Sequence, residues 1–184
     1  AYVLCGMDVF DSINPSIGAV ATGGFSTRAD NLAFYQNKPE YNIVGIEFVS
    51  IVLMLLGGTN FYASLLLLKG RFKDFFRHCE NKVVIAMMVF FIPVFTIILY
   101  QGKYCPTVAS SAMNAAFHVV SAFSTTGYTT VNNFMQYAPA CFIPMIIMMI
   151  IGGATNSTAG GIKQYRAAVL AKSLFWNVKR KIVP

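Results

Sequence analysis

Residues 43–68 form an apolar run that limits this chain to few kinds of fold. At about 1.5 Å per residue, a helix of that length spans roughly 39 Å. The hydrocarbon core of a membrane is roughly 30 Å thick, so the run predicts a transmembrane helix that is tilted or kinked. A second apolar run, residues 83–100, is also long enough to cross, and Pro93 in its middle predicts a kink.

The composition agrees with a membrane protein. Charged residues make up 11% of the chain, against roughly 25% in soluble domains. The 16 Phe and 9 Tyr exclude a disordered chain, because disordered segments are poor in aromatic residues.

The positions of the basic residues predict the orientation of the chain in the membrane. The net charge is +7, and most of the 14 Lys and Arg residues lie in two short segments, 69–82 and 163–184. Short loops rich in Lys and Arg stay on the cytoplasmic side. We therefore predict a multi-pass protein of the cell membrane in which both segments are cytoplasmic. Its partner is the lipid bilayer and not a nucleic acid.

A third apolar region, residues 137–151, is too short to cross a membrane alone. It is followed by the Gly-rich segment 152–161 and then by a second helical pattern. This order predicts a transmembrane helix that is interrupted inside the membrane. Irregular backbone at that depth is tolerated only where protein buries it or where it lines a water-filled cavity. The interruption therefore indicates an ion or substrate path.

Two further segments, residues 8–20 and 110–123, each have the length of one short helix. They precede stretches rich in Gly and Thr at 21–28 and 124–130. By the orientation above, both stretches face the outside. We predict that each pair forms a re-entrant unit, in which a half-helix enters the membrane and a loop returns.

Asp8 and Asp11 stand at the start of the first half-helix. Their position predicts that they cap the N-terminus of that helix. The alternative is an acidic outer vestibule that concentrates cations.

The two re-entrant units belong to an internal repeat. Placing Gly24 on Gly127, an offset of 103, aligns the two Gly/Thr-rich stretches. Downstream, similar Gly-Gly-Thr-Asn elements stand at 57–60 and 152–156. A unit repeated in the same order is a fold-level signal. The predicted fold is an all-α integral membrane protein with repeated membrane–pore–membrane units, re-entrant pore helices and a broken transmembrane helix.

The Gly/Thr-rich loops carry the residue types that a potassium pathway needs. Such pathways replace the water of the ion with backbone carbonyls from a short loop that follows a half-helix. Glycine adopts the φ values that this loop requires, and the negative C-terminal end of the half-helix faces the ion. The residues predicted to bind the ion are Thr22, Gly23, Gly24, Phe25, Thr125, Thr126, Gly127 and Tyr128.

Three motifs resemble those of the Trk/Ktr/HKT superfamily of potassium transporters: Thr-Gly-Gly-Phe-Ser-Thr at 22–27, Thr-Thr-Gly-Tyr at 125–128, and Gly-Gly-Ala-Thr-Asn-Ser-Thr-Ala-Gly-Gly-Ile-Lys at 152–163. Members of this superfamily resemble channels with four linked membrane–pore–membrane repeats around one pore. The resemblance implies that residues 1–82 are repeat two and residues 83–184 are repeat three. The missing repeats would belong to the same, longer chain.

The resemblance also implies roles and partners. Gly24 and Gly127 would be filter glycines, and K+ or Na+ would be the transported ion, bound at the filter carbonyls with no covalently bound cofactor. A homodimer and a cytosolic nucleotide-binding regulatory subunit are implied as well. A gating loop below the filter would consist of Gly152, Gly153, Ala154, Thr155, Asn156, Ser157, Thr158, Ala159, Gly160 and Gly161.

Two other functions stay open on the sequence alone. One is an intramembrane hydrolase with Ser157 as the nucleophile, for which His118 is the candidate general base at membrane depth. The other is a non-conducting membrane scaffold. The duplicated loop favours a transport protein over an enzyme.

Overall fold

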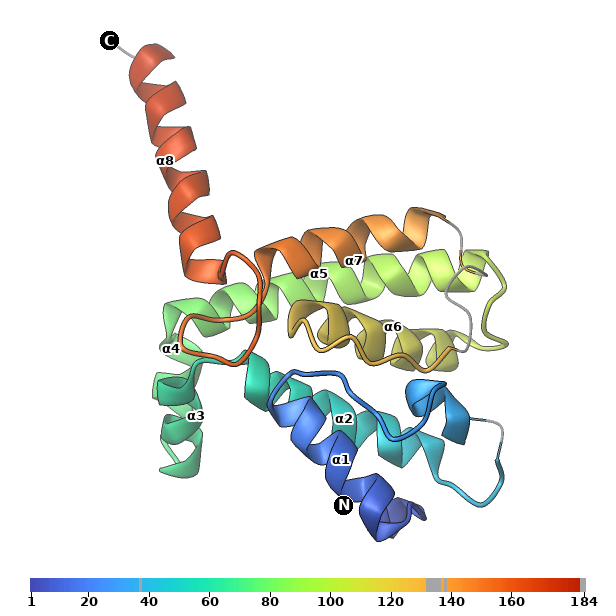
Figure 1. Ribbon diagram of the computed structural model, residues 1–184. Helices are drawn as coiled ribbons and strands as arrows, with labels where there is room; N and C mark the ends of the chain where they lie inside the picture. Colours follow the sequence, from blue (N-terminus) through green and yellow to red (C-terminus); the bar gives the residue numbers. More distant parts are fainter. Residues whose placement is uncertain (37, 132–136, 138, 183–184) are drawn as a thin grey trace.

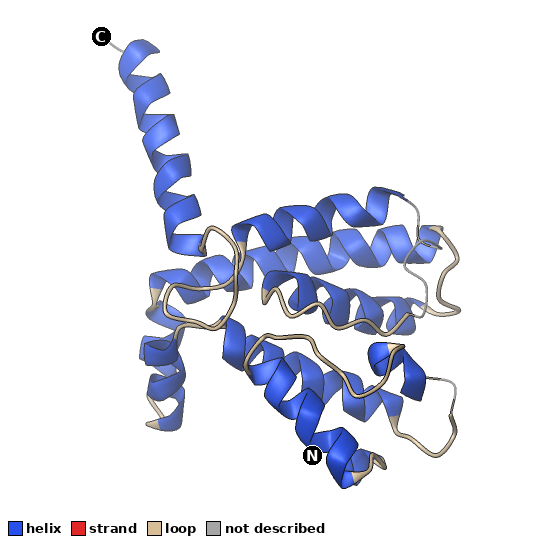
Figure 2. Cartoon of the chain, in the orientation of Figure 1, coloured by secondary structure: helices blue, strands red, loops and turns tan. Residues whose placement is uncertain are grey.

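The computed structural model describes residues 1–36, 38–131, 137 and 139–182, and these residues form helices and loops without a strand (Figures 1 and 2). Position 138 of the third apolar region and positions 183–184 of the predicted cytoplasmic tail lie outside them. In chain order the helices are η1 (Tyr2–Cys5), α1 (Val9–Val20), η2 (Asn31–Tyr35), α2 (Ile43–Gly58), α3 (Phe61–Leu68), α4 (Phe72–Arg77), α5 (Cys79–Gln101), α6 (Val108–Phe123), α7 (Pro139–Ile151) and α8 (Gln164–Ile182).

Polar side chains fix where several helices begin. Asn42 caps α2 and Asn60 caps α3, each accepting a hydrogen bond from a backbone N–H of the first turn at 3.1 Å and 2.9 Å. Thr107 and Ser110 form a reciprocal capping box at the start of α6. Since the first N–H groups of a helix have no partner within the helix, these side chains define the starting residues.

The apolar run 43–68 is not one continuous helix, and its break is sharper than the predicted tilt or kink. The run folds as α2 and α3, and the chain bends by 118° between them. Thr59 takes extended backbone, with φ −89° and ψ 160°. The Asn60 side chain then accepts a hydrogen bond from the Tyr62 N–H, in the first turn of a helix that starts in a new direction.

The second apolar run folds as a single helix, α5, which starts earlier than predicted and continues through Pro93. By length and composition, α5 can cross a membrane, and the bent pair α2–α3 meets the same criteria only when it counts as one span. The segment 69–82, predicted as a loop, contains α4 and the first turn of α5.

Two hydrophobic cores meet at α6. The first core lies among η1, α1, η2, α2 and one side of α6, and it includes Ile46 and Phe117. The second lies among α5, α6 and α7, and it includes Phe95 and Met148. These three helices lie side by side in Figure 1, whereas α8 projects away from the other helices. α6 therefore joins the two halves of the described chain.

Large apolar side chains also face outward. Phe48 on α2, Val89 on α5 and Ile143 on α7 are 60%, 69% and 61% exposed. Apolar side chains that are exposed on several helices are what a membrane protein presents to lipid or to neighbouring helices.

Candidate functional site

Two loops follow the short helices α1 and α6. We call residues 21–28 the first Gly loop and residues 124–130 the second Gly loop. Each has left-handed backbone at its first Thr and again two residues later: φ is 51° at Thr22 and 69° at Gly24, and 55° at Thr125 and 85° at Gly127. Glycine adopts this conformation freely, whereas threonine does so only where the surrounding structure holds it.

Three hydrogen bonds fold the first Gly loop back onto the end of α1. The Thr22 N–H donates to the Ala19 carbonyl at 3.3 Å, and the Gly23 N–H donates to the Gly18 carbonyl at 2.8 Å. The Thr22 hydroxyl donates to the Ala21 carbonyl at 2.8 Å. Together these bonds make the sharp turn that ends the helix.

The same three bonds recur 103 residues later. The Thr125 N–H donates to the Ala122 carbonyl at 3.1 Å, and the Thr126 N–H donates to the Ser121 carbonyl at 3.0 Å. The Thr125 hydroxyl donates to the Ser124 carbonyl at 2.7 Å. In Figure 2 the loop then runs back along α6. The two Gly loops thus have left-handed residues at equivalent positions and form equivalent hydrogen bonds.

Tyr128 joins the two Gly loops. Its hydroxyl lies 3.1 Å from the carbonyl oxygens of both Phe25 and Pro15 and can donate to either. Gly18 leaves room for this ring, since a Cβ there would collide with the Tyr128 hydroxyl. Phe25 holds the equivalent position in the first loop, yet its side chain is 82% exposed.

Glycines allow the close approach of backbone in this region. A Cβ on Gly24 would collide with the Thr126 carbonyl oxygen, so the two Gly loops touch there. A Cβ on Gly57 would collide with the Val20 carbonyl at the end of α1, and one on Gly58 would crowd the end of α6. The Gly-Gly element of α2 therefore lies where both half-helices end.

The segment between α7 and α8, residues 152–161, lies against the same point. The Gly160 N–H donates to the Thr125 hydroxyl at 2.6 Å. The Thr158 hydroxyl lies 2.9 Å from the Val20 carbonyl oxygen at the end of α1. The structure thus brings together the three segments that the sequence singles out.

Glu80, at the start of α5, ties the two Gly-Gly elements together. It is 4% exposed. One carboxylate oxygen accepts a hydrogen bond from the Asn60 amide at 2.8 Å, and the other accepts from the Thr155 N–H at 3.0 Å. The sequence carries no signal for this contact, because a lone acidic residue between His78 and Lys82 resembles a solvated surface position.

We expect Glu80→Gln to lower the thermal stability of the full-length protein. A glutamine amide presents an NH2 group where the carboxylate presents an acceptor, so one of the two buried donors loses its partner. Such a loss costs about 1–3 kcal/mol. The melting temperature of the purified protein in detergent measures the effect. Glu40→Gln, at an exposed position, is the control variant. Equal melting temperatures for the two variants would show that Glu80 does not hold the loop.

The predicted capping role of Asp8 and Asp11 is wrong. Asp8 stands at the N-cap of α1 but makes no side-chain capping bond. Asp11 instead accepts a hydrogen bond from the Thr27 hydroxyl at 2.8 Å and forms an ion pair with Arg28 at 2.8 Å. The bonds from Arg28 and Thr27 hold the pKa of the Asp11 carboxyl below its usual value. Arg28 also offsets the negative charge that an acidic vestibule would need.

The residues of the hydrolase alternative are engaged elsewhere. The Ser157 hydroxyl donates to the Ala154 carbonyl at 2.5 Å. His118 is fully buried, and its Nδ1 lies 2.8 Å from the Asn114 carbonyl oxygen of its own helix. A nucleophile activated for attack donates its proton to a general base and not to a neighbouring carbonyl, so this arrangement favours packing roles for both side chains.

Comparison with known proteins defines the class to which the chain belongs. The sequence model of a family described as cation transport proteins matches residues 4–184. The chain is therefore a member of that class, and it belongs to the TrkH family. The resemblance to the Trk/Ktr/HKT potassium transporters is confirmed.

Individual relatives agree with this assignment. The Trk system potassium uptake protein TrkH of Escherichia coli K12 is 29% identical over 182 residues, which are 97% of this chain and 36% of the relative. A cation transporter of Methanocaldococcus jannaschii, itself uncharacterized, is 30% identical over 98% of this chain and 34% of its own length. The chain thus spans about a third of the relatives it matches.

A solved structure confirms the all-α membrane fold. The crystal structure of the potassium transporter TrkH from Vibrio parahaemolyticus is similar with a TM-score of 0.87 and 24% sequence identity. The similarity covers 98% of this chain and 38% of that one.

Proposed function

We propose that the full-length protein takes up K+ through a selectivity filter to which each Gly loop contributes one segment. The observation that carries this proposal is the recurrence, 103 residues apart, of one pattern of left-handed residues and hydrogen bonds. In a regular strand, successive residues alternate in direction, so their backbone carbonyls point to opposite sides. Left-handed residues at every second position turn carbonyls toward one side, which is what an ion that has lost its water requires.

Backbone oxygens are the main ligands in this proposal. The filter residues are those of the two Gly loops at 22–25 and 125–128. The hydroxyls of Thr22 and Thr125 already donate to neighbouring carbonyls, so they stabilise the turns. The Phe25 and Tyr128 carbonyls accept hydrogen bonds from the Tyr128 and Ser121 hydroxyls, so the carbonyls of 22–24 and 125–127 are the main proposed ligands. The C-terminal ends of α1 and α6 meet at Gly57 and Gly58, and their negative ends would favour a cation there.

We propose that residues 152–161 form a gating loop below the filter. Two hydrogen bonds support this role. The Gly160 N–H donates to the Thr125 hydroxyl, and the Thr158 hydroxyl donates to the Val20 carbonyl. Gly152 and Gly161 flank the loop with φ of 70° and 80°. Glycine at both ends allows the backbone to change conformation without moving α7 and α8.

The proposal includes the organisation of the whole protein. Residues 1–82 and 83–184 are two membrane–pore–membrane repeats, and further repeats of the longer chain complete the pore. Segments 69–82 and 163–184 face the cytoplasm, and the Gly loops face the outside. The whole protein forms a homodimer regulated by a cytosolic nucleotide-binding subunit. The exposed Phe25 side chain supports a neighbouring repeat, since the equivalent Tyr128 packs on the first repeat.

Growth of cells that lack their own potassium uptake systems tests the proposal. We expect the full-length protein to restore growth at limiting K+, and Ser157→Ala to restore it equally well because no hydrolysis is involved. Failure to restore growth, with the protein present in the membrane, would favour the non-conducting scaffold. A Ser157→Ala variant that loses a hydrolytic activity while it keeps K+ flux would favour the hydrolase.

A further inference from the structure

One side-chain hydrogen bond recurs at the same position in both repeats and ties each Gly loop to its own half-helix. In the first repeat the Thr27 hydroxyl donates to Asp11 Oδ1 at 2.8 Å. In the second the Thr130 hydroxyl donates to Asn114 Oδ1 at 3.1 Å. Donor and acceptor are 16 residues apart in both repeats. We call the pairs Thr27–Asp11 and Thr130–Asn114 the two straps.

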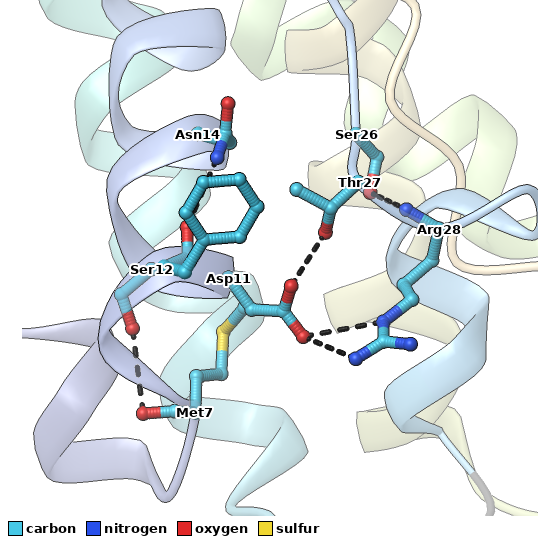
Figure 3. Close-up of polar contacts among 8 residues, drawn as sticks. Met7, Asp11, Ser12, Asn14, Ser26, Thr27 and Arg28 are labelled. Carbon is cyan, nitrogen blue, oxygen red and sulfur yellow. Dashed lines mark hydrogen bonds and ion pairs between the residues drawn. The ribbon is translucent and has the colours of Figure 1, made fainter.

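Arg28 adds an ion pair to the first strap alone. Its Nε and one terminal nitrogen lie 3.2 Å and 2.8 Å from Asp11 Oδ2. Figure 3 shows Thr27 and Arg28 reaching the carboxylate from the returning chain, while Asp11 projects from α1. The residue equivalent to Arg28 is Val131, and the residue equivalent to Asp11 is Asn114. The acceptor is thus charged where a guanidinium accompanies it and amide where none does.

The straps enclose the proposed ion-binding residues. The chain between Asp11 and Thr27 contains the end of α1 and all of residues 22–25. Each strap has one buried end: Asp11 is 7% exposed and Thr130 is fully buried, whereas Thr27 is exposed and Asn114 is half-buried. Loss of either hydrogen bond therefore leaves a buried polar group without this partner.

We propose that the two straps determine ion specificity. Each strap holds the chain that follows a filter segment, at Thr27 or Thr130, at a fixed distance from its half-helix. This inference rests on the proposed function. Na+ is smaller than K+, so carbonyls must move closer together to replace its water. A filter segment that is fixed by its strap resists this closer approach of the carbonyls, and a segment released from the strap allows it. Asp11, Thr27, Asn114 and Thr130 are positioning residues that act through the backbone carbonyls.

Removing the hydroxyl donors tests the straps. Thr27→Val and Thr130→Val keep the shape of the side chain and lose the hydrogen bond. In liposomes that contain the full-length protein, we expect each variant to lower the K+-over-Na+ permeability ratio about fivefold, the scale of one hydrogen bond. Thr27→Ser and Thr130→Ser retain the hydroxyl, and we expect them to keep the wild-type ratio. A merely structural role would lower the amount of assembled protein without changing the ratio.

A matched variant uses the second strap as a template for the first. Asp11→Asn combined with Arg28→Val reproduces the pair Asn114 and Val131, so we expect the ratio to be retained. Unchanged ratios in both Thr→Val variants would overturn the straps while the filter proposal stands. A wild-type protein that does not distinguish K+ from Na+ would overturn the proposed filter and the straps together.

Discussion

Replacing Gly127 with Ala in the full-length protein is expected to abolish K+ uptake or to remove its selectivity. The φ of Gly127 is 85°, a conformation that costs an L-residue about 1–2 kcal/mol. An added Cβ would meet nothing within 4 Å, so the change acts through backbone strain alone. The strain is relieved when the neighbouring peptide turns, and this turns a proposed filter carbonyl away from the ion. The initial rate of K+ uptake into cells measures the loss.

Gly70→Ala is the matched control for Gly127→Ala. Gly70 lies between α3 and α4, has φ 71°, and also offers open space to a Cβ. The backbone strain is therefore similar, while no filter carbonyl is involved, and we expect normal uptake. Gly24→Ala is expected to be more severe than either, since its Cβ would also collide with the Thr126 carbonyl. Equal uptake by Gly127→Ala and Gly70→Ala would exclude a filter role for Gly127.

Shortening the 152–161 loop is expected to raise K+ flux. Deleting residues 157–159 removes the Thr158 hydroxyl from the end of α1 and the carbonyls of Ser157 and Ala159 that bind the Lys163 ammonium. In the proposed gating role, these contacts hold the loop where it obstructs the pore, and each contributes about 0.5–1.5 kcal/mol to that closed arrangement. A loss of about 1.4 kcal/mol corresponds to a tenfold shift toward the open one. Flux at a fixed K+ gradient measures this shift.

Thr158→Val is the control that keeps the length of the loop. It removes only the hydroxyl contacts with the Val20 and Gly57 carbonyls, so a smaller rise in flux is expected. Normal or reduced flux through the shortened protein, once correct membrane insertion has been shown, would contradict an obstructing role for residues 152–161.

The half-helices are predictable from the sequence because their limits are local. The pattern predicts a helix over 110–123 and α6 covers Val108–Phe123, since Thr107 caps its start and Gly/Thr-rich residues end it. The helix end at Thr59 and Asn60 is not predictable in the same way. The surrounding run is uniformly apolar, and the Gly-Gly-Thr-Asn element signalled a repeat without showing that the chain turns there.

The contacts of acidic residues could not be predicted for a different reason. Capping rules consider only neighbours in sequence, whereas Asp11 binds Thr27 and Arg28 after the chain has turned through the whole first Gly loop. Glu80 likewise binds Asn60 and Thr155, which lie 20 and 75 residues away in the chain. Such contacts depend on the packing of several elements and not on local pattern.

The most direct test of a carbonyl filter is the K+-over-Na+ permeability of the purified full-length protein in liposomes, measured for wild type, Gly127→Ala and Gly70→Ala together. We expect K+-selective flux from wild type and Gly70→Ala, and absent or unselective flux from Gly127→Ala. Wild-type liposomes that pass no more K+ than protein-free liposomes, or three proteins with the same selectivity, would contradict the proposed filter.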